Sequence, residues 1–310
     1  MKIASIDIGT NTCNLLVAEL NSTQKLVFIH RDKKAITLIN NKDYTNNNIS
    51  SESISNLINV INNYKDKISE LGAEKIIVTA TSGIRSANNK DQVLNAVKNE
   101  TGIDIDLING QREAELVFTG VKNAVNFNEQ PALIIDIGGG SIEFIIAKSS
   151  EIIYKESFQI GAARLLNKYR FADPLTVDDI YQINNILKAN LTELFDNCKS
   201  LNIKNLIGAS GSYETFADLI KYEFDVAKIR DTDAFNTIDL DYFNKIHNKL
   251  IRYNFEERKN MPGMEIIRVK LIPLASVITK YIIDELNINL MIQSNFSIKE
   301  GLIFDYLYNN

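Results

Sequence analysis

The chain has no tryptophan and few of the residues that build disulfide frameworks or metal centres. Its 310 residues include two cysteines, Cys13 and Cys198, and two histidines, His30 and His247. The cysteines lie far apart and form no Cys-x-x-Cys motif, so neither a disulfide scaffold nor a cysteine zinc site is expected. Glycine and proline number only 14 and 4, which excludes collagen-like and linker-rich chains.

Positive charge is not in excess either. The net charge is −5 and the isoelectric point about 5.3, so no nucleic-acid partner is expected. No apolar run approaches the roughly 20 residues of a membrane helix, so we expect no membrane partner. The first apolar stretch is interrupted by Asp7, which is not typical of a signal peptide and favours a cytoplasmic location.

One pattern occurs twice in the chain. Ser5–Asn11 reads as an apolar strand that ends in Asp-Ile-Gly, and an apolar run follows at Leu15–Ala18; Ile134–Gly140 and Phe144–Ala147 repeat this arrangement. The copies lie about 130 residues apart, which is the size of a domain rather than of a solenoid repeat. We therefore predict two domains of similar architecture, 1–126 and 127–310, each opening with a hairpin.

The segments between the repeats alternate between strand and helix patterns. Apolar runs predict strands, and apolar residues at helical spacing predict helices. The expected strands of the first half are 25–29, 75–80 and 103–108, with helices at 54–71 and 92–100 and after Gly110. The expected elements of the second half are strands at 131–136, 142–147, 152–158, 206–209 and 290–293, a long helix from Pro174 through Leu194, and a last helix at about 298–310. This alternation indicates an α/β fold.

The two glycine-rich turns favour a phosphate ligand. Successive backbone N–H groups in such turns form concave anion sites, and the absence of a Cβ allows close approach. Asp136 and Glu143 flank the second turn, and carboxylates there suit a hard cation such as Mg²⁺. The alternatives are a tight turn without a ligand and, at Glu143, an ordinary exposed glutamate on the second strand of the hairpin. Neither a P-loop nor a dinucleotide-binding fingerprint is present.

Taken together, five motifs resemble the exopolyphosphatase/guanosine pentaphosphate phosphohydrolase (Ppx/GppA) family, which belongs to the actin-like superfamily. The resemblance spans nearly the whole chain. The motifs occur in this order: Asp7–Asn11 (DIGTN), Thr81–Arg85 (TSGIR), Gly110–Ala114 (GQREA), Asp136–Glu143 (DIGGGSIE) and Gly208–Gly211 (GASG). The resemblance implies two actin-like (ribonuclease-H-like) α/β domains with a cleft between them, and a last helix that packs on the first domain.

The resemblance also implies a role for each matching residue. Glu113 matches the catalytic glutamate that orients or deprotonates the attacking water, and Arg85 matches an arginine that holds substrate phosphates. Asp136 and Glu143 match the Mg²⁺ carboxylates. The implied substrate-binding residues lie in three loops: Asp7, Gly9, Thr10 and Asn11; Gly138, Gly139, Gly140 and Ser141; Gly208, Ser210 and Gly211.

From the residues alone, Arg85 and Glu113 also have purely structural interpretations. Arg85 could form a salt bridge at the start of a helix, and Glu113 could complement a helix dipole. The basic residues after His30, which are Arg31, Lys33 and Lys34, could meet a polyanion or lie on a solvated edge strand.

The chain departs from the family pattern in two places. Arg268-Val269-Lys270 stands where Arg-x-Asp is usual, and Ile298–Gly301 (IKEG) stands where Leu-Arg-Glu-Gly is usual. The C-terminal HD-type domain of some members is not expected here.

We therefore predict a Mg²⁺-dependent exopolyphosphatase that removes terminal orthophosphate from linear polyphosphate. Hydrolysis of the 5′-phosphate of pppGpp is the first alternative. An ATP-dependent kinase and a non-catalytic, nucleotide-binding or filament-forming actin relative are further alternatives. The sequence leaves a homodimer open.

Overall fold

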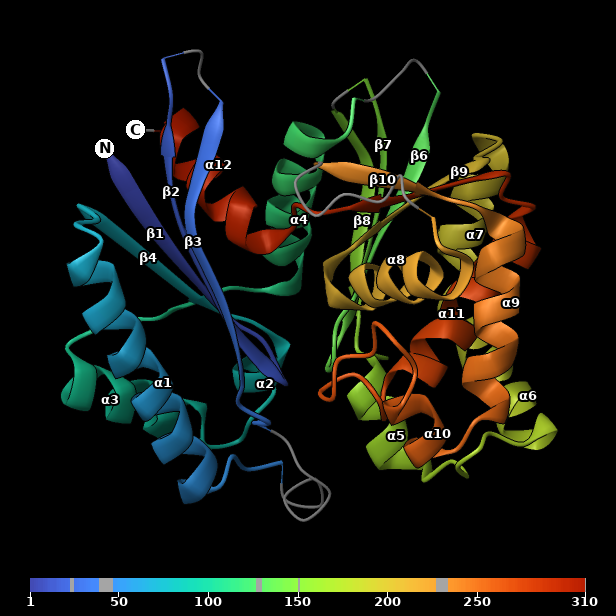
Figure 1. Ribbon diagram of the computed structural model, residues 1–310, viewed down its shortest axis with the longest axis horizontal. Helices are drawn as coiled ribbons and strands as arrows, with labels where there is room; N and C mark the ends of the chain where they lie inside the picture. Colours follow the sequence, from blue (N-terminus) through green and yellow to red (C-terminus); the bar gives the residue numbers. More distant parts are fainter. Residues whose placement is uncertain (23–24, 39–46, 127–129, 150, 227–233, 310) are drawn as a thin grey trace. The chain divides into compact units, whose positions relative to one another are not determined.

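The structure, a computed structural model, describes residues 1–309 apart from 23–24, 39–46, 127–129, 150 and 227–233. The chain forms two compact units. Unit 1 comprises Met1–Gly120 and Ile298–Asn310, and unit 2 comprises Val121–Ser297 (Figure 1). The chain thus passes from one unit to the other at two points. The boundary predicted after residue 126 adjoins residues outside the described part of the chain.

Unit 1 is a mixed five-stranded sheet with helices on both faces. Its strands have the order β3-β2-β1-β4-β5, in which β1 is antiparallel to β2 and parallel to β4. Along the chain its elements are β1 (Lys2–Ile8), β2 (Thr12–Leu20), β3 (Leu26–Ala35), α1 (Ser51–Glu70), β4 (Lys75–Ala80), α2 (Ser82–Arg85), α3 (Lys90–Thr101), β5 (Asp106–Leu107), α4 (Gly110–Ala124, which continues into unit 2) and α12 (Ile298–Asn309).

The two faces of this sheet follow from the alternation of side chains along the strands. Ile6, Ile8 and Leu15 point to the face that α1 and α3 cover, and they belong to the larger core of unit 1. Ile3 and Leu16 point to the opposite face and pack with α12. Because both faces are apolar, each one needs a helical layer.

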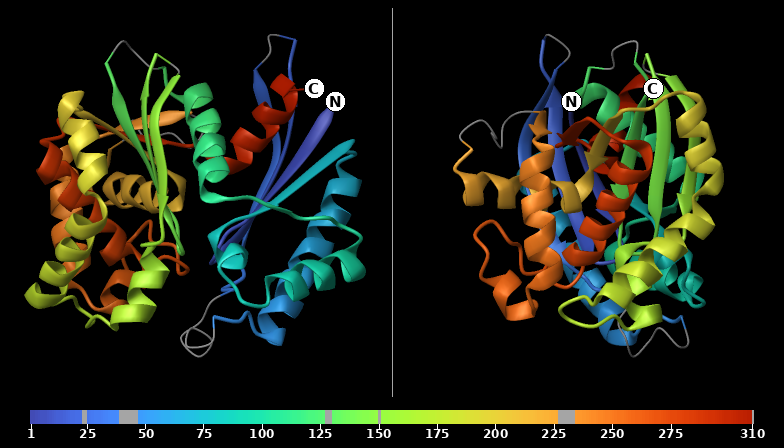
Figure 2. Two further views of the ribbon diagram at one scale, coloured as in Figure 1. Left: turned by 180° about the vertical axis from the view of Figure 1, so that it is seen from behind. Right: turned by 90° about the vertical axis from the view of Figure 1, so that its right-hand side faces the viewer.

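Helix α12 completes unit 1 from the other end of the chain. It packs on β1 and β2, as Figures 1 and 2 show. Ile303 is fully buried on this face. A Cβ at Gly301 would lie 2.0 Å from the carbonyl oxygen of Leu116, so α12 and α4 approach each other as closely as glycine permits. Helix α12 therefore belongs to unit 1, although it is the last element of the chain.

Unit 2 is a mixed six-stranded sheet of order β10-β11-β9-β6-β7-β8. Along the chain its elements are β6 (Ala132–Ile137), β7 (Ile142–Lys148), β8 (Glu151–Phe158), α5 (Ala162–Tyr169), α6 (Val177–Asn190), α7 (Thr192–Ser200), β9 (Asn205–Ala209), α8 (Ser210–Phe224), β10 (Phe235–Ile238), α9 (Leu240–Arg252), α10 (Phe255–Lys259), α11 (Ile272–Leu286) and β11 (Leu290–Ser294). Helix α11 lies deep in the core, which the sequence indicates by its nearly unbroken apolar run.

The two units repeat one topology. In each, three consecutive strands form an antiparallel meander, and a later strand joins the first of them in parallel: β4 beside β1, and β9 beside β6. The repeated Asp-Ile-Gly motif connects the first two strands in both units. The sequence repeat is therefore a repeat of structure.

Several details differ from the sequence-based expectations. The strand expected at 103–108 is reduced to β5, because only two of its residues pair with β4. The long helix expected through Leu194 is two helices, since Leu191 leaves helical geometry at φ −106° and ψ 16°. Strand β10 was not predicted.

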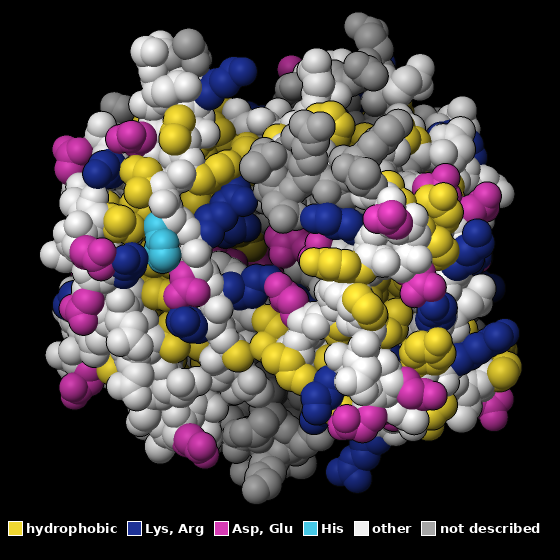
Figure 3. Space-filling model, viewed as in Figure 1, with side chains coloured by type: hydrophobic (Ala, Val, Ile, Leu, Met, Phe, Trp, Pro, Cys, Tyr) yellow, Lys and Arg dark blue, Asp and Glu magenta, His cyan; other side chains and the backbone are white. Residues whose placement is uncertain are grey.

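Figure 3 shows acidic and basic side chains interspersed on the face it presents. Among the described residues, no helix combines the length and the apolar character that crossing a bilayer requires.

Candidate active site

The two glycine turns have the same local geometry. Gly9 donates its N–H to the Thr12 carbonyl at 2.9 Å, and Gly138 donates its N–H to the Ser141 carbonyl at 3.0 Å. A Cβ on either glycine would approach that same carbonyl oxygen at 3.2 and 3.0 Å. The repeat therefore extends to individual hydrogen bonds.

The first turn is held by the segment that follows β3. The Thr10 carbonyl accepts the N–H of Leu38, and the Asn11 carbonyl accepts the N–H of Ile36. In a trans peptide the N–H points away from the preceding carbonyl. The N–H groups of Asn11 and Thr12 are therefore turned away from this segment.

The second turn, Gly138–Ser141, is held by the start of α5. The carbonyls of Gly138 and Gly139 accept the N–H groups of Ala162 and Arg164, both at 3.0 Å, and Arg164 Nε donates to the Gly140 carbonyl at 2.8 Å. By the same trans geometry, the N–H groups of Gly139, Gly140 and Ser141 point away from α5. Successive backbone N–H groups in such a turn can bind an oxyanion.

Gly161 sets how closely α5 approaches this turn. A Cβ at Gly161 would lie 2.5 Å from Gly139 O, Gly140 C and Ser141 N. Its backbone, at φ −60° and ψ 156°, is open to any residue, so the requirement for glycine is one of space. Sequence reasoning missed Gly161 because only the tertiary contact distinguishes it.

Arg85 and Glu113 lie together in unit 1. Arg85 Nη1 donates to Glu113 Oε2 and to the Ile108 carbonyl, both at 2.8 Å. Glu113 is 5% exposed on the first turn of α4. Arg85 Nη2 is buried and has no hydrogen-bond partner among the described residues. A buried guanidinium donor of this kind favours an anionic ligand.

Helix α2, which carries Arg85, adjoins the first turn. A Cβ at Gly83 would lie 2.8 Å from the Cα of Thr10, so α2 packs directly on that turn. Asp7, at the end of β1, accepts a hydrogen bond from Asn14 Nδ2 at 3.2 Å. The unit 1 residues predicted for the site are therefore neighbours along the carboxyl ends of β1 and β4.

Asp136 and Glu143 are direct cross-strand partners on β6 and β7, so their carboxylates share one face of the sheet. They are 4% and 1% exposed, which excludes the exposed-strand interpretation of Glu143. Ser297 Oγ donates to Asp136 Oδ2 at 2.8 Å, and Ser157 Oγ donates to Glu143 Oε1 at 2.7 Å.

Two buried, adjacent carboxylates among neutral hydroxyls form an all-oxygen donor set. Such a set fits Mg²⁺, which commonly takes one or two protein carboxylates and completes its shell with water and phosphate oxygens. Among the described residues, no group of three or more Asp, Glu, His or Cys side chains converges into a metal cluster. The two carboxylates would therefore supply only part of the coordination shell of such an ion.

The third turn joins β9 to α8. Ser210 has φ +65°, a left-handed conformation that costs a non-glycine residue about 1 kcal/mol. The ring of Tyr213 covers Gly208, and the guanidinium of Arg268 covers Gly211, where a Cβ would lie 1.7 Å from Nη2. Burial and the negative charge of Asp136 raise the pKa of Tyr213, so its phenol stays protonated.

Arg268 is a second residue that sequence reasoning did not assign to the site. Its Nε is buried without a hydrogen-bond partner among the described residues, and its Glu265 neighbour is 4.0 Å away. The sequence indicated Arg268 only through the departure from the family pattern at 268–270.

The cysteines are not candidates for nucleophiles. Both are fully buried. Burial, together with the nearby Asp7 carboxylate, raises the pKa of Cys13, and burial raises the pKa of Cys198 to about 12. Neither thiol is therefore available as a thiolate.

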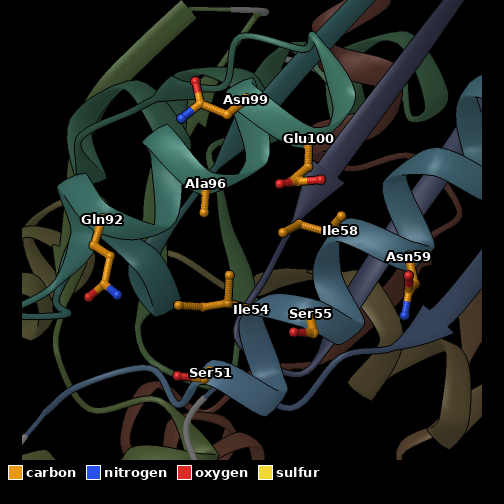
Figure 4. Close-up of a pocket in the computed structure, with 9 residues that line it drawn as sticks. All are labelled: Ser51, Ile54, Ser55, Ile58, Asn59, Gln92, Ala96, Asn99 and Glu100. Carbon is orange, nitrogen blue, oxygen red and sulfur yellow. The ribbon is translucent and has the colours of Figure 1, made fainter.

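The structure groups the predicted residues into two sets. One set lies in unit 1 (Asp7, Gly9, Thr10, Asn11, Arg85 and Glu113), and the other lies in unit 2 (Asp136, Gly138, Gly139, Gly140, Ser141, Glu143, Gly208, Ser210 and Gly211). A groove of about 430 Å³ between α1 and α3 contains none of them (Figure 4). Its lining is isoleucine, alanine, serine and amide side chains with one glutamate, so none of the lining residues is a cation that could pair with phosphate.

Comparison with known proteins connects this arrangement to a family. The model of the Ppx/GppA phosphatase family matches residues 16–310. The chain belongs to the Ppx/GppA phosphatase family. This membership confirms the resemblance that the five motifs indicated.

Solved structures of this family share the fold. An exopolyphosphatase from Cytophaga hutchinsonii is 30% identical, with a TM-score of 0.95 over 99% of this chain and 98% of that one. A Ppx/GppA family member from Aquifex aeolicus is 24% identical, with a TM-score of 0.81 over 100% and 99%. The predicted α/β class, with two units of similar topology, is confirmed.

Curated relatives of this Ppx/GppA protein are longer than it is. A bifunctional 3-dehydroquinate synthase/phosphatase from Fusobacterium nucleatum is 34% identical over 68% of this chain and 33% of its own length. A guanosine-5′-triphosphate,3′-diphosphate pyrophosphatase from Photobacterium profundum is 23% identical over 98% of this chain and 59% of its own length. The chain thus spans between a third and three fifths of these relatives.

Proposed function

We propose that this Ppx/GppA protein is an exopolyphosphatase that releases orthophosphate from the end of linear polyphosphate. The observation that carries the choice of substrate is the likeness to the Cytophaga hutchinsonii exopolyphosphatase over essentially the full length of both chains. The arrangement of donors in the two turns supports a phosphate ligand, and the buried Nη2 of Arg85 supports an anion beside Glu113.

In the proposed reaction, a water oxygen forms a bond to the terminal phosphorus while the bridging P–O bond breaks. Glu113 accepts the proton of the water, and the shortened chain leaves as a phosphate oxyanion. Arg85 binds terminal oxygens, and the N–H groups of the Gly138–Ser141 turn stabilise the charge that develops on them. Orthophosphate and a chain shorter by one phosphate are the products.

Asp136 and Glu143 would hold Mg²⁺ in this proposal. When bound, the ion supplies charge neutralisation to the phosphate oxygens. The Ser297 and Ser157 hydroxyls orient the two carboxylates through the hydrogen bonds described above. The proposal further requires that the unit 1 and unit 2 sets of residues bind the same substrate.

Phosphate release from polyphosphate in the presence of Mg²⁺ tests the proposal. We expect Glu113→Gln to lower kcat at least 100-fold, because a positioned general base contributes about 10²–10⁴-fold. Glu115→Gln is the matched control, since Glu115 lies on the same helix and pairs with Arg112 at the surface. Full activity in Glu113→Gln would remove this residue from its role.

Hydrolysis of pppGpp is the second candidate, favoured by curated relatives with that printed activity at 23% and 25% identity. The two candidates share the chemistry and differ in the group that is attached beyond the reacting phosphate. Turnover of both substrates by one preparation decides between them: a kcat/KM for pppGpp above that for polyphosphate would reverse our choice.

A further inference from the structure

A polar row crosses the face of the unit 1 sheet that α12 covers. Cross-strand pairing aligns Lys33 with Asn14, Asn14 with Asp7, Asp7 with Thr79 and Thr79 with Asp106. Partners in register present their side chains on the same face. These five residues, here called the polar row, therefore lie side by side on one face of all five strands.

The polar row begins where the apolar part of this face ends. Ile3 and Ala18 are buried beneath α12, and the next aligned pair is Ser5 and Leu16, with Ser5 Oγ bound to the Lys299 carbonyl at 2.7 Å. The polar row comes next along β1, at the end that leads into the Gly9 turn. It is thus the part of the face that adjoins the candidate site.

The basic residues of β3 divide between the two faces of the sheet. Arg31 and Lys33 point to the α12 side, whereas Lys34 points to the α1 side, because neighbours along a strand alternate. Arg31 stacks on Phe28 with its Cζ 3.7 Å from the ring centroid, and its Nη2 lies 3.6 Å from the buried carboxylate of Glu300. Arg31 therefore contacts α12, and Lys33 is the basic residue that aligns with Asn14 and Asp7 in the polar row.

We infer that Lys33 binds the phosphate units beyond the reacting one, and so makes the site select an extended polyanion. The inference rests on the proposed function. Lys33 stands two strands from Asp7, which is about 10 Å along the polar row. For a substrate whose reacting phosphate lies at the Gly9 turn, next to Asp7, a linear polyphosphate still carries negative charge this far along its chain, whereas tripolyphosphate ends sooner and pppGpp continues as a nucleoside.

The physical basis is a charge-assisted contact at a half-buried position. The four-carbon stem of lysine lets Nζ follow a flexible chain as a point charge, without the fixed fork of arginine. Contacts of this kind are worth about 1.5 kcal/mol, which corresponds to roughly tenfold in affinity. Loss of the Lys33 contact should raise KM and leave kcat nearly unchanged, because Lys33 lies away from the P–O bond that breaks.

The test compares Lys33→Gln with Lys34→Gln, which removes a neighbouring charge on the opposite face, where Lys34 pairs with Asp32 at 3.3 Å. We expect Lys33→Gln to raise KM for long-chain polyphosphate about tenfold with kcat within twofold, and to change KM for tripolyphosphate and pppGpp less than threefold. Lys33→Arg should restore most of the affinity. Equal behaviour of the two glutamine variants, or an equal loss on all three substrates, would overturn the inference.

Calorimetric titration with long-chain polyphosphate separates this inference from the proposed function. If the wild-type protein releases no phosphate yet binds the polymer, and Lys33→Gln alone weakens that binding, the inference stands and the proposed activity falls. If the wild-type protein hydrolyses the polymer and Lys33→Gln leaves KM unchanged, the activity stands and the inference falls. A wild-type protein that does not bind the polymer refutes both.

Discussion

The spacing between Gly161 and the second turn permits a quantitative prediction. In Gly161→Ala the new Cβ would meet three backbone atoms at 2.5 Å, whereas ordinary contacts of a Cβ begin at 3.4 Å. Either the turn or α5 must therefore move by about 1 Å. A displacement of that size at a catalytic constellation can cost about 100-fold in rate.

The expected result is a fall in kcat/KM for polyphosphate of about 100-fold, with a loss of about 1–3 kcal/mol in the free energy of unfolding. Isothermal titration with orthophosphate gives a second readout that does not depend on turnover, and affinity should fall as well. Steady-state phosphate release and urea denaturation monitored by circular dichroism supply the other measurements.

Gly102→Ala is the matched control, because the two glycines are required for opposite reasons. Gly102 has φ +70° and nothing within 4 Å of an added Cβ, so its replacement costs about 1 kcal/mol through the backbone alone. It should lower stability and leave kcat/KM unchanged. If Gly161→Ala stays within threefold of the Gly102→Ala activity, the argument that α5 positions the turn is refuted.

Three further predictions concern other parts of the molecule. Burial, and to a smaller extent Lys280, lower the pKa of His247 to about 4. Between pH 6.5 and 4 the unfolded chain therefore binds a proton at this histidine that the folded chain does not, and the free energy of unfolding should fall by about 3 kcal/mol. Urea titrations should find this loss absent in His247→Gln. Arg268→Ala should raise KM at least fivefold with little change in the urea midpoint, since this guanidinium covers the Gly211 turn; an unchanged KM would make Arg268 structural. Gly301→Ala should lower the thermal midpoint markedly, because its Cβ would lie 2.0 Å from a backbone oxygen of α4; an unaltered midpoint would contradict the close helix contact.

Local patterns predicted the elements best. Strand β4 matches the predicted 75–80, because its apolar run is bounded by polar residues. The break at Leu191 was missed, since buried residues at positions 183, 187 and 191 keep helical spacing through it. Strand β10 has four residues and depends on its pairing with β11 for its identity, which a short window of sequence does not contain.

The candidate site shows the same division between local and tertiary information. The glycine turns could be predicted because each follows an Asp-Ile-Gly motif, and the motif occurs twice in the chain. The ion pair of Arg85 with Glu113 joins residues 28 positions apart through a contact that no spacing indicates. Gly161 contacts the turn only in the folded chain, so no pattern in the sequence indicates its importance.

The return of α12 to unit 1 has a consequence for folding during synthesis. Residues 121–297, which form unit 2, leave the ribosome before α12 does. Until α12 emerges, the face of β1 and β2 that carries Ile3 and Leu16 has no helix to cover it. Domains generally fold as units during translation, so the later unit can close first and the earlier one last. A nascent chain stalled before residue 298 would therefore expose this apolar face of the unit 1 sheet, and we expect chaperones that bind exposed apolar surfaces to bind it.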